Sequence, residues 1–192
     1  MPALASWSAR GDLTSTNYSD FVALFEAWAN RTLRVRQMET SATITMSSGS
    51  GSLPTDYLQW RRATWNGSPT QELEYVHPSV LQGYYPTASS FTPTLFTIQG
   101  SSLNTQSTDA TDILLEYWQK ISSLETNSTN WLMTAHPDFY LAGTLVELYL
   151  FNKDPDNALI WKGRRDELLG EISRLDKASI GPAAIRVFGP TP

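Results

Sequence analysis

The chain has 192 residues and a mass of 21.4 kDa, a length that fits a single domain with one sizeable hydrophobic core. Fourteen basic and nineteen acidic residues give a net charge of −5, a balance that disfavours avid DNA binding through phosphate neutralisation. The sequence has no cysteine, which excludes disulfides, zinc–thiolate sites, iron–sulfur clusters and cysteine nucleophiles.

The first periodic segment of the chain covers residues 20–33. Phe21 and Phe25, with the apolar residues around them, recur at the spacing that places side chains on one face of a helix. Asn17 or Ser19 could cap the start of this helix, because both residue types accept hydrogen bonds from free backbone N–H groups. The pattern predicts an amphipathic helix with one apolar stripe.

The hydrophobic period then changes from about 3.6 residues to 2, which is typical of a strand. Apolar residues alternate with Ser and Thr over residues 42–46, and a Ser/Gly run over residues 47–52 predicts a flexible loop. A second strand is predicted over residues 57–65. Asn66-Gly67 would close it in a tight hairpin turn, and residues 73–76 would pair back onto it.

The middle of the chain continues this β-rich pattern. A short helical turn is predicted over residues 80–84, and Gly100 is placed as a turn between strands. Residues 38–122 are therefore predicted to form one β-rich block. Its remaining strands are expected over residues 95–98, around Leu103 and over residues 112–118.

From Asn130 onward the sequence returns to helix. Pro137 suits the first position of a helix, because its fixed φ is helical and its missing N–H would be unpaired there. Residues 139–151 are apolar on nearly every face, which predicts a central, buried helix. This is the longest apolar run, and it is far short of the roughly 20 residues of a membrane span. Gly143 within it predicts the close approach of another backbone.

A last helix is predicted to open at Asp154-Pro155 and to end near Asp176. One face of this helix would be apolar. The residues on that face are Ala158, Trp161, Leu168, Leu169, Ile172 and Leu175.

Residues 177–192 are rich in Gly and Pro and are predicted to form an extended C-terminal arm. The arm carries one apolar patch between its Gly-Pro breakers, and this patch could add a strand to another chain's sheet edge or lie in a groove between subunits. Disorder is the alternative. The patch consists of Ala183, Ala184, Ile185, Arg186, Val187 and Phe188.

The predicted fold class is α+β, with an α-helical bundle, a β-rich insertion and an extended arm. One domain would contain all three parts. The bundle would comprise residues 18–36 and 128–176, the insertion residues 38–122 and the arm residues 177–192.

The sequence carries little that points to catalysis. It has no nucleophile elbow, no zinc-protease helix motif, no phosphate-binding loop and no dinucleotide fingerprint. His77 and His136 are the only candidate bases near neutral pH, yet each directly precedes a proline at a predicted helix start. Asp154 and Asp156 are better explained as helix-capping residues than as calcium ligands. We therefore expect no enzyme activity, no cofactor and no metal.

Arginines provide the only notable basic concentration. Contact with phosphate is one interpretation of this group. Pairing with acidic groups of the same chain or of a neighbouring subunit suits the acidic composition better. The five residues are Arg31, Arg34, Arg36, Arg61 and Arg62.

Four stretches together resemble one protein family. They are Leu33-Arg-Val-Arg-Gln-Met-Glu-Thr40, Leu53-Pro-Thr-Asp-Tyr-Leu58, Leu73-Glu-Tyr-Val-His-Pro78 and Asn130-Trp-Leu-Met-Thr-Ala-His-Pro-Asp-Phe-Tyr-Leu-Ala-Gly143. In this order and spacing, they resemble the head-to-tail adaptor proteins, also called connector or head-completion proteins, of tailed bacteriophages and gene transfer agents. The resemblance covers about residues 18–176.

This resemblance implies a structural virion protein of the neck, made in the host cytoplasm. It implies a ring of identical subunits, usually a dodecamer, beneath the portal protein. Such a ring extends the DNA channel, through which DNA passes without specific binding, and it offers a docking platform for the tail or a stopper protein. In such proteins the C-terminal arm tends to reach the portal, and residues 183–188 are the matching candidate. No membrane partner is expected.

Two other functions compete with this one. A carbohydrate-binding module would use exposed aromatic rings of the β-rich block as a sugar platform, although burial in the core is the preferred interpretation of these rings. A small hydrolase would use His77 or His136 with a serine or an aspartate. The aromatic rings in question are Trp60, Trp65, Tyr75, Tyr84 and Tyr85.

Overall fold

A computed structural model describes residues 15–179 of the chain, and the predicted apolar patch of the arm lies outside the described residues. The described part contains five α-helices and two β-sheets, which confirms the α+β fold class. It divides into two compact units. The helical unit runs up to Gln37 and resumes at Ile121, and the β unit comprises Met38–Lys120. Each unit is described here by itself.

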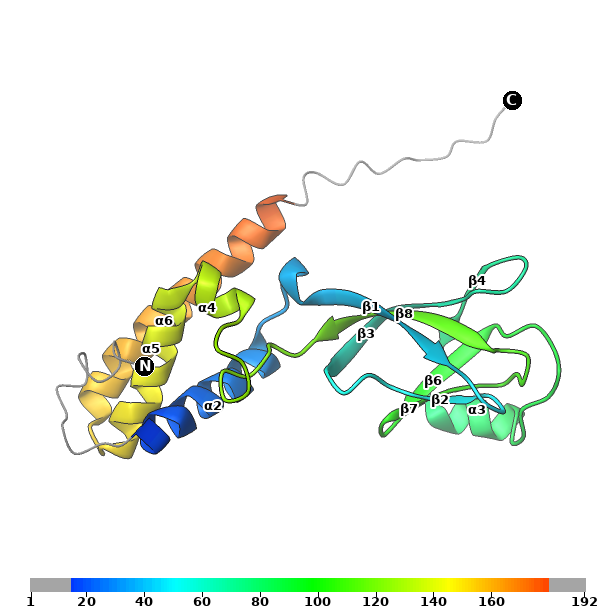
Figure 1. Cartoon of the computed structure of the whole chain (residues 1–192), viewed down its shortest axis with the longest axis horizontal. Coiled ribbons are helices and arrows are strands. Elements are labelled where there is room, and N and C mark those ends of the chain that lie inside the picture. The colour runs from blue at the N-terminus through cyan, green and yellow to red at the C-terminus, as the bar shows by residue number, and fades with distance from the viewer. Residues whose placement is uncertain (1–14, 180–192) are drawn as a thin grey trace, which may run out of the picture. The chain divides into compact units, whose positions relative to one another are not determined.

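The helical unit consists of three longer helices and one short one (Figure 1). Asn130 caps the short helix, because its side-chain oxygen accepts a hydrogen bond of 2.8 Å from the N–H of Met133. Pro137 occupies the first turn of the next helix, as predicted. Asp154 starts the last helix by accepting hydrogen bonds from the backbone and side chain of Asn157. The helices are α2 (Ser15–Thr32), α4 (Trp131–Ala135), α5 (Pro137–Phe151) and α6 (Pro155–Ser179).

Aromatic rings fill the core of the helical unit. Phe25 of α2 is almost fully buried and meets the rings of Phe139 and Tyr140 edge-on, at centroid distances of 5.2 and 4.9 Å. Such edge-to-face pairs add stability beyond the burial of apolar area. Gly143 of α5 faces the ring of Phe25, where a Cβ atom would clash. The close approach predicted at this glycine therefore exists, but its partner is an aromatic ring and not a backbone.

Three predictions about the helices need correction. The first helix begins at Ser15, so Asn17 and Ser19 lie inside it and do not cap it. The last helix continues to Ser179, beyond the predicted end near Asp176, because Lys, Ala and Ser are all compatible with helix before the Gly-Pro breaker. Leu175 is 61% exposed and does not share the buried face of Ala158, Leu168 and Ile172.

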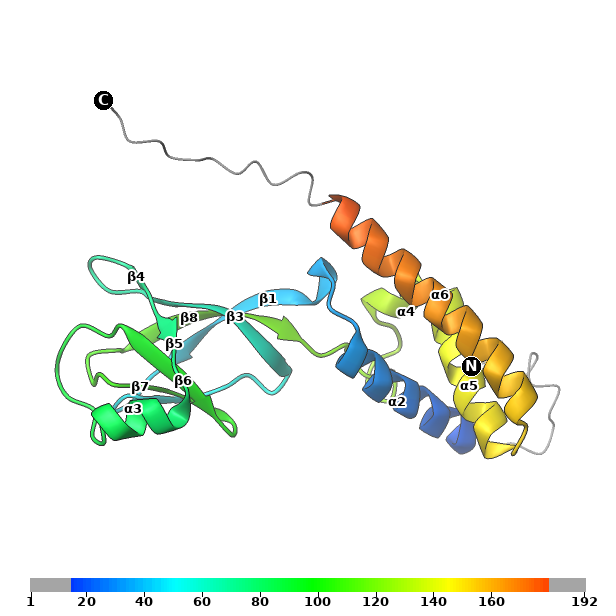
Figure 2. The ribbon, with the colours of Figure 1, turned by 180° about the vertical axis from the view of Figure 1, so that it is seen from behind.

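The β unit contains two four-stranded sheets (Figure 2). The first sheet has the order β1-β8-β3-β4, and all its neighbouring strands are antiparallel. One of its two inner strands, β8, alternates buried and half-buried residues over most of its length, so one face of the sheet is turned to the core. The strands are β1 (Glu39–Thr45), β3 (Tyr57–Trp65), β4 (Gln71–Glu72) and β8 (Asp112–Gln119).

The second sheet has the order β2-β7-β6-β5, with β5 and β6 parallel. Apolar residues from strands of both sheets form one buried cluster, which includes Ile44, Phe96, Leu103 and Leu115. Phe96 and Leu103 are fully buried in it. The remaining elements of the unit are β2 (Ser50–Ser52), β5 (Glu74–Tyr75), α3 (Pro78–Tyr84), β6 (Leu95–Gln99) and β7 (Ser102–Thr105).

The predicted hairpin after β3 differs from the observed one. The strand predicted over residues 57–65 is present with the same bounds, but only Gln71 and Glu72 form the strand that pairs back onto it. Glu74 and Tyr75 instead pair with β6 of the other sheet, so the predicted pairing of residues 73–76 is wrong beyond their first residue. Gly67 has no positive φ, so Asn66-Gly67 does not form the tight turn.

The prediction of a loop over the whole Ser/Gly run, residues 47–52, is only partly correct. Its last three residues form β2 and pair with β7. Gly49, with a φ of +81°, occupies the turn that precedes this strand.

Candidate functional site

The five arginines of the sequence analysis lie in two different units. Arg31, Arg34 and Arg36 follow or end α2 in the helical unit. Arg61 and Arg62 lie on β3 in the β unit. They are therefore described as two groups and not as one basic site.

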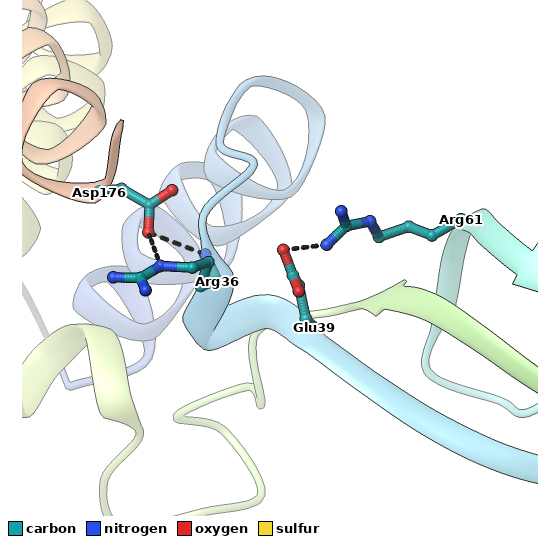
Figure 3. Close-up of polar contacts among 4 residues, drawn as sticks. All are labelled: Arg36, Glu39, Arg61 and Asp176. Atoms are coloured by element: carbon teal, nitrogen blue, oxygen red, sulfur yellow. Dashed lines mark hydrogen bonds and ion pairs between the residues drawn. The ribbon is translucent and has the colours of Figure 1, made fainter. Parts of the chain in front are cut away.

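Arg36 is tied to the last helix of its own unit (Figure 3). Its backbone N–H and its Nε both donate to Oδ1 of Asp176, at 3.1 and 3.2 Å. The Asp176 side chain is only 11% exposed, so this pair is better shielded from water than the pairs of Arg61 and Arg62 on the β unit. The contact fastens the C-terminal part of α6 to the segment that follows α2.

Arg31 and Arg34, the other two candidate arginines in the helical unit, differ in their contacts. Arg34 donates from Nη1 to the carbonyl oxygens of Asn30 and Leu33, at 2.8 and 2.6 Å. Carbonyl groups at the end of a helix lack helical partners, so a cation is favourable there. Arg31 is exposed and makes no ion pair within the described residues.

On the β unit, the arginines lie on the outer face of the first sheet. Arg61 pairs with Glu39 (Figure 3), and its guanidinium lies 4.8 Å from the ring centre of Trp118. Arg62 pairs with Glu72 at 3.1 Å and approaches Glu116 at 4.0 Å. Pairing on the same chain is therefore present for both residues. A further pairing with a neighbouring subunit stays a prediction.

An open, shallow depression of about 350 Å³ lies on this outer face. Its lining is polar and includes the paired Glu39 and Arg61 together with Glu116. Ligand pockets are usually lined mainly by apolar side chains with a few polar groups. This depression is therefore better described as part of a charged protein surface than as a small-molecule pocket.

The two histidines occupy local structural positions. His77 accepts a hydrogen bond of 3.3 Å from the N–H of Ser79 and so caps α3, and its Nδ1 also lies 2.8 Å from the Ser79 hydroxyl. His136 joins α4 to α5, and its side chain makes no capping hydrogen bond. Across residues 15–179, no group of three or more His, Asp or Glu side chains is placed to hold a metal ion.

Only some of the five aromatic rings of the β unit are buried, although burial was predicted for all of them. Trp60 stacks on Tyr75 at 5.1 Å and meets Phe96 edge-on at 5.3 Å, and Trp65 also packs against the core. This packing does not favour a sugar platform made of tryptophans. Tyr84, by contrast, is 79% exposed, so its predicted burial is wrong. Tyr85, at 40%, and Tyr75, at 37%, are also exposed, so their predicted burial is wrong as well.

A buried polar network in the helical unit was not predicted from the sequence. Glu26 of α2 is 4% exposed, and its Oε1 accepts hydrogen bonds from the Tyr140 hydroxyl at 2.8 Å and from the N–H of Leu124 at 2.9 Å. Asn130 donates to the Tyr140 oxygen at 2.6 Å and to the carbonyl of Ser122 at 2.7 Å. Burial is the main cause that raises the pKa of Tyr140 well above its usual range. The network holds the segment before α4 against α2 and α5.

The end of the α5–α6 hairpin exposes several large apolar side chains. Leu150 and Phe151 end α5, and Leu159 and Ile160 lie in the first turns of α6. All four are more than half exposed, with Leu159 at 70%. Exposed apolar groups that gather in one place are typical of a protein–protein contact. None of the described helices is long and apolar enough to cross a membrane.

The family model for the SU10 adaptor protein matches residues 1–186. The chain belongs to this family. The SU10 adaptor family is a phage head-to-tail adaptor family, so the protein is a structural component of a phage particle. No curated protein matches the sequence.

Proposed function

We propose that this SU10 adaptor forms a ring beneath the portal, extends the DNA channel and provides the docking platform for the tail or a stopper protein. The match to the SU10 adaptor family over residues 1–186 is the observation that carries this proposal. A dodecamer is the ring size that we propose. Subunits of a ring contact each other through two different surfaces, and the contacts close on themselves.

Two features of the chain support this role. The exposed apolar side chains of the α5–α6 hairpin, such as Leu159 and Ile160, provide contact area that a solitary subunit would not need. The net charge of −5 suits a wall along which DNA slides, because a basic wall would retain it. The ion pairs of Arg61 and Arg62 leave few free cations on the β unit for phosphate contact.

The C-terminal arm is the segment that we propose for portal attachment, through residues 183–188. An extended apolar segment gains affinity by pairing with an exposed strand or by filling a groove. The arm begins after Ser179, where α6 ends. A truncation after Ser179 therefore removes the proposed segment and leaves the described helices complete.

The test compares the truncated chain with the full chain in co-sedimentation with portal rings from the same genome. We expect the truncated chain to keep its melting temperature and to lose most of its portal binding. A full-length variant with Phe188→Asp serves as the milder probe of the same contact. Portal binding by the truncated chain at the level of the full chain would reject the role of the arm.

A further inference from the structure

The first strand of the β unit is an unusually open sheet edge. β1 lies at the end of its sheet and pairs only with β8, along a register without a bulge. The other edge strands, β2, β4 and β5, have three, two and two residues, whereas β1 has seven. Proteins usually protect a sheet edge by short strands, proline, lysine or bulges. The sequence of β1, Glu-Thr-Ser-Ala-Thr-Ile-Thr, contains none of these protections.

The register identifies which backbone groups of β1 are unpaired. The N–H of Met46 donates to the carbonyl of Thr111 at 2.8 Å, directly beyond the last paired residues of β1 and β8. Backbone groups alternate in direction along an antiparallel strand, so those of Ser41, Thr43 and Thr45 point away from β8. Within residues 15–179, the outward backbone groups of Ser41 and Thr43 have no backbone partner, whereas Gly51 of β2 lies close to the carbonyl of Thr45. The side chains of Ser41 and Thr43 are exposed as well.

The sequence offers a segment that matches this edge. Residues 183–188 read Ala-Ala-Ile-Arg-Val-Phe, so in an extended conformation Ile185 and Val187 share one face and Arg186 lies on the other. Thirteen residues follow Ser179 and would span at most about 45 Å when extended, which is long enough to reach another molecule.

Both faces of an added strand would find complementary neighbours. Ala42 on the inner face of β1 is only half-buried, so Ile185 and Val187 would cover it and extend the core. On the outer face, Glu39 of β1 and Glu116 of the neighbouring β8 are solvent-accessible carboxylates, and residues 38–120 contain seven acidic and three basic side chains. Arg186 on that face would meet an acidic surface.

We propose that β1 accepts residues 183–188 of a second copy of the chain as an added strand. The contact is heterologous, because the arm of one copy meets the sheet edge of the next. It goes beyond the portal contact proposed above, since it concerns the adaptor before it meets a portal. When a portal is present, the portal competes with β1 for residues 183–188.

The test uses full-length protein without portal and a pair of complementary variants. Thr43→Pro removes the N–H that would bind the incoming strand, at an outward-facing position where an edge strand tolerates proline. Thr43→Val, which keeps that N–H, is its matched control. Ile185→Asp with Val187→Asp disables the arm and leaves β1 intact.

Sedimentation velocity over a range of concentrations then measures how strongly the copies associate. We expect reversible association of the wild type and of Thr43→Val, and an association that is weaker by about tenfold or more in Thr43→Pro and in the arm variant. Mixing Thr43→Pro with the arm variant should restore a one-to-one complex, because the mixture contains one intact arm and one intact edge. A wild type that stays monomeric, or a mixture without this complex, would overturn the proposal.

Hydrogen exchange provides a second measurement that does not depend on the folding of Thr43→Pro. The amides of Ser41 and Thr43 should become protected as the concentration of the wild type rises, and this protection should be absent in the arm variant. If the protection persists in the arm variant, β1 of a second copy occupies the edge and the proposal is wrong. Unprotected amides at all concentrations would contradict it too.

Discussion

The buried network of the helical unit and the charged outer face of the first sheet of the β unit show two different uses of polar groups. In the helical unit, Glu26, Tyr140 and Asn130 form a hydrogen-bonded network within the buried interior. In the β unit, the charged groups of Arg61 and Arg62 form ion pairs on the outer face of a sheet. Buried networks specify one arrangement of the chain, whereas exposed ion pairs contribute little to stability. The network around Glu26 thus fixes the packing of its helices, whereas the ion pairs of β3 lie at the surface of the β unit.

The sharpest test of this comparison removes one buried ring from each unit. Phe25→Ala in the helical unit and Phe96→Ala in the β unit should each cost about 3–5 kcal/mol of the free energy of unfolding, because each leaves a cavity in a dry core. We propose that the two units open separately. The backbone amides that lose protection against hydrogen exchange should then lie mainly in α5 for Phe25→Ala and mainly in β8 for Phe96→Ala. Equal loss in both units for either variant would argue for a single cooperative fold.

The buried network should give the next largest effect. Glu26→Ala leaves the Tyr140 hydroxyl and the N–H of Leu124 without their acceptor, which should cost about 2–3 kcal/mol. Glu26→Gln keeps an acceptor oxygen and should cost clearly less. Chemical denaturation of both variants measures the difference. Glu116→Ala, on the exposed face of the β unit, is the control, and an equal loss for Glu116→Ala would refute the contrast between the units.

Alkaline pH should destabilise the β unit through Tyr117. Burial, together with the neighbouring Asp56 carboxylate, raises the pKa of Tyr117 from 10.0 to about 12. The folded state therefore keeps a proton that the unfolded state releases, so the contribution of Tyr117 to stability is constant well below pH 10 and falls as the pH rises from 10 toward 12. Melting temperatures measured from pH 8 to pH 12 should show this fall, and Tyr117→Phe should reduce it. A fall of the same steepness in Tyr117→Phe would assign the effect to other groups.

The smallest effects are expected for the ion pairs. Asp176→Asn weakens the contact with Arg36, whose partner carboxylate is mostly shielded, and should cost about 1 kcal/mol. Glu72→Gln removes an exposed partner of Arg62 and should cost less than about 0.5 kcal/mol. Denaturation at low and high salt measures both values. A larger loss for Glu72→Gln than for Asp176→Asn would contradict the ranking.

The sequence pattern predicted those elements whose formation depends on residues close to one another in the sequence. The strand over residues 57–65 and the helix beginning at Pro137 agree with the structure, because strand alternation and the fixed φ of proline act within a few residues. The end of the last helix was placed three residues early, since the Gly-Pro breaker acts only after Ser179.

Contacts between distant residues were not predictable in the same way. Glu26 and Tyr140 are 114 residues apart, and only the packing of α2 against α5 brings them together. The partner of Gly143 is the Phe25 ring, which a glycine in a helical pattern does not specify. The arginines looked like one basic group because the sequence shows their order but not their assignment to separate units.

The central claim is that this chain forms a ring on the portal, and electron microscopy tests it most directly. The purified chain is mixed with portal rings from the same genome, and the particles are averaged. We expect an added collar at the tail-facing end of the portal, with residues 183–188 in contact with portal subunits. Intact portal rings without a collar, at concentrations where the chain is in excess, would contradict the claim.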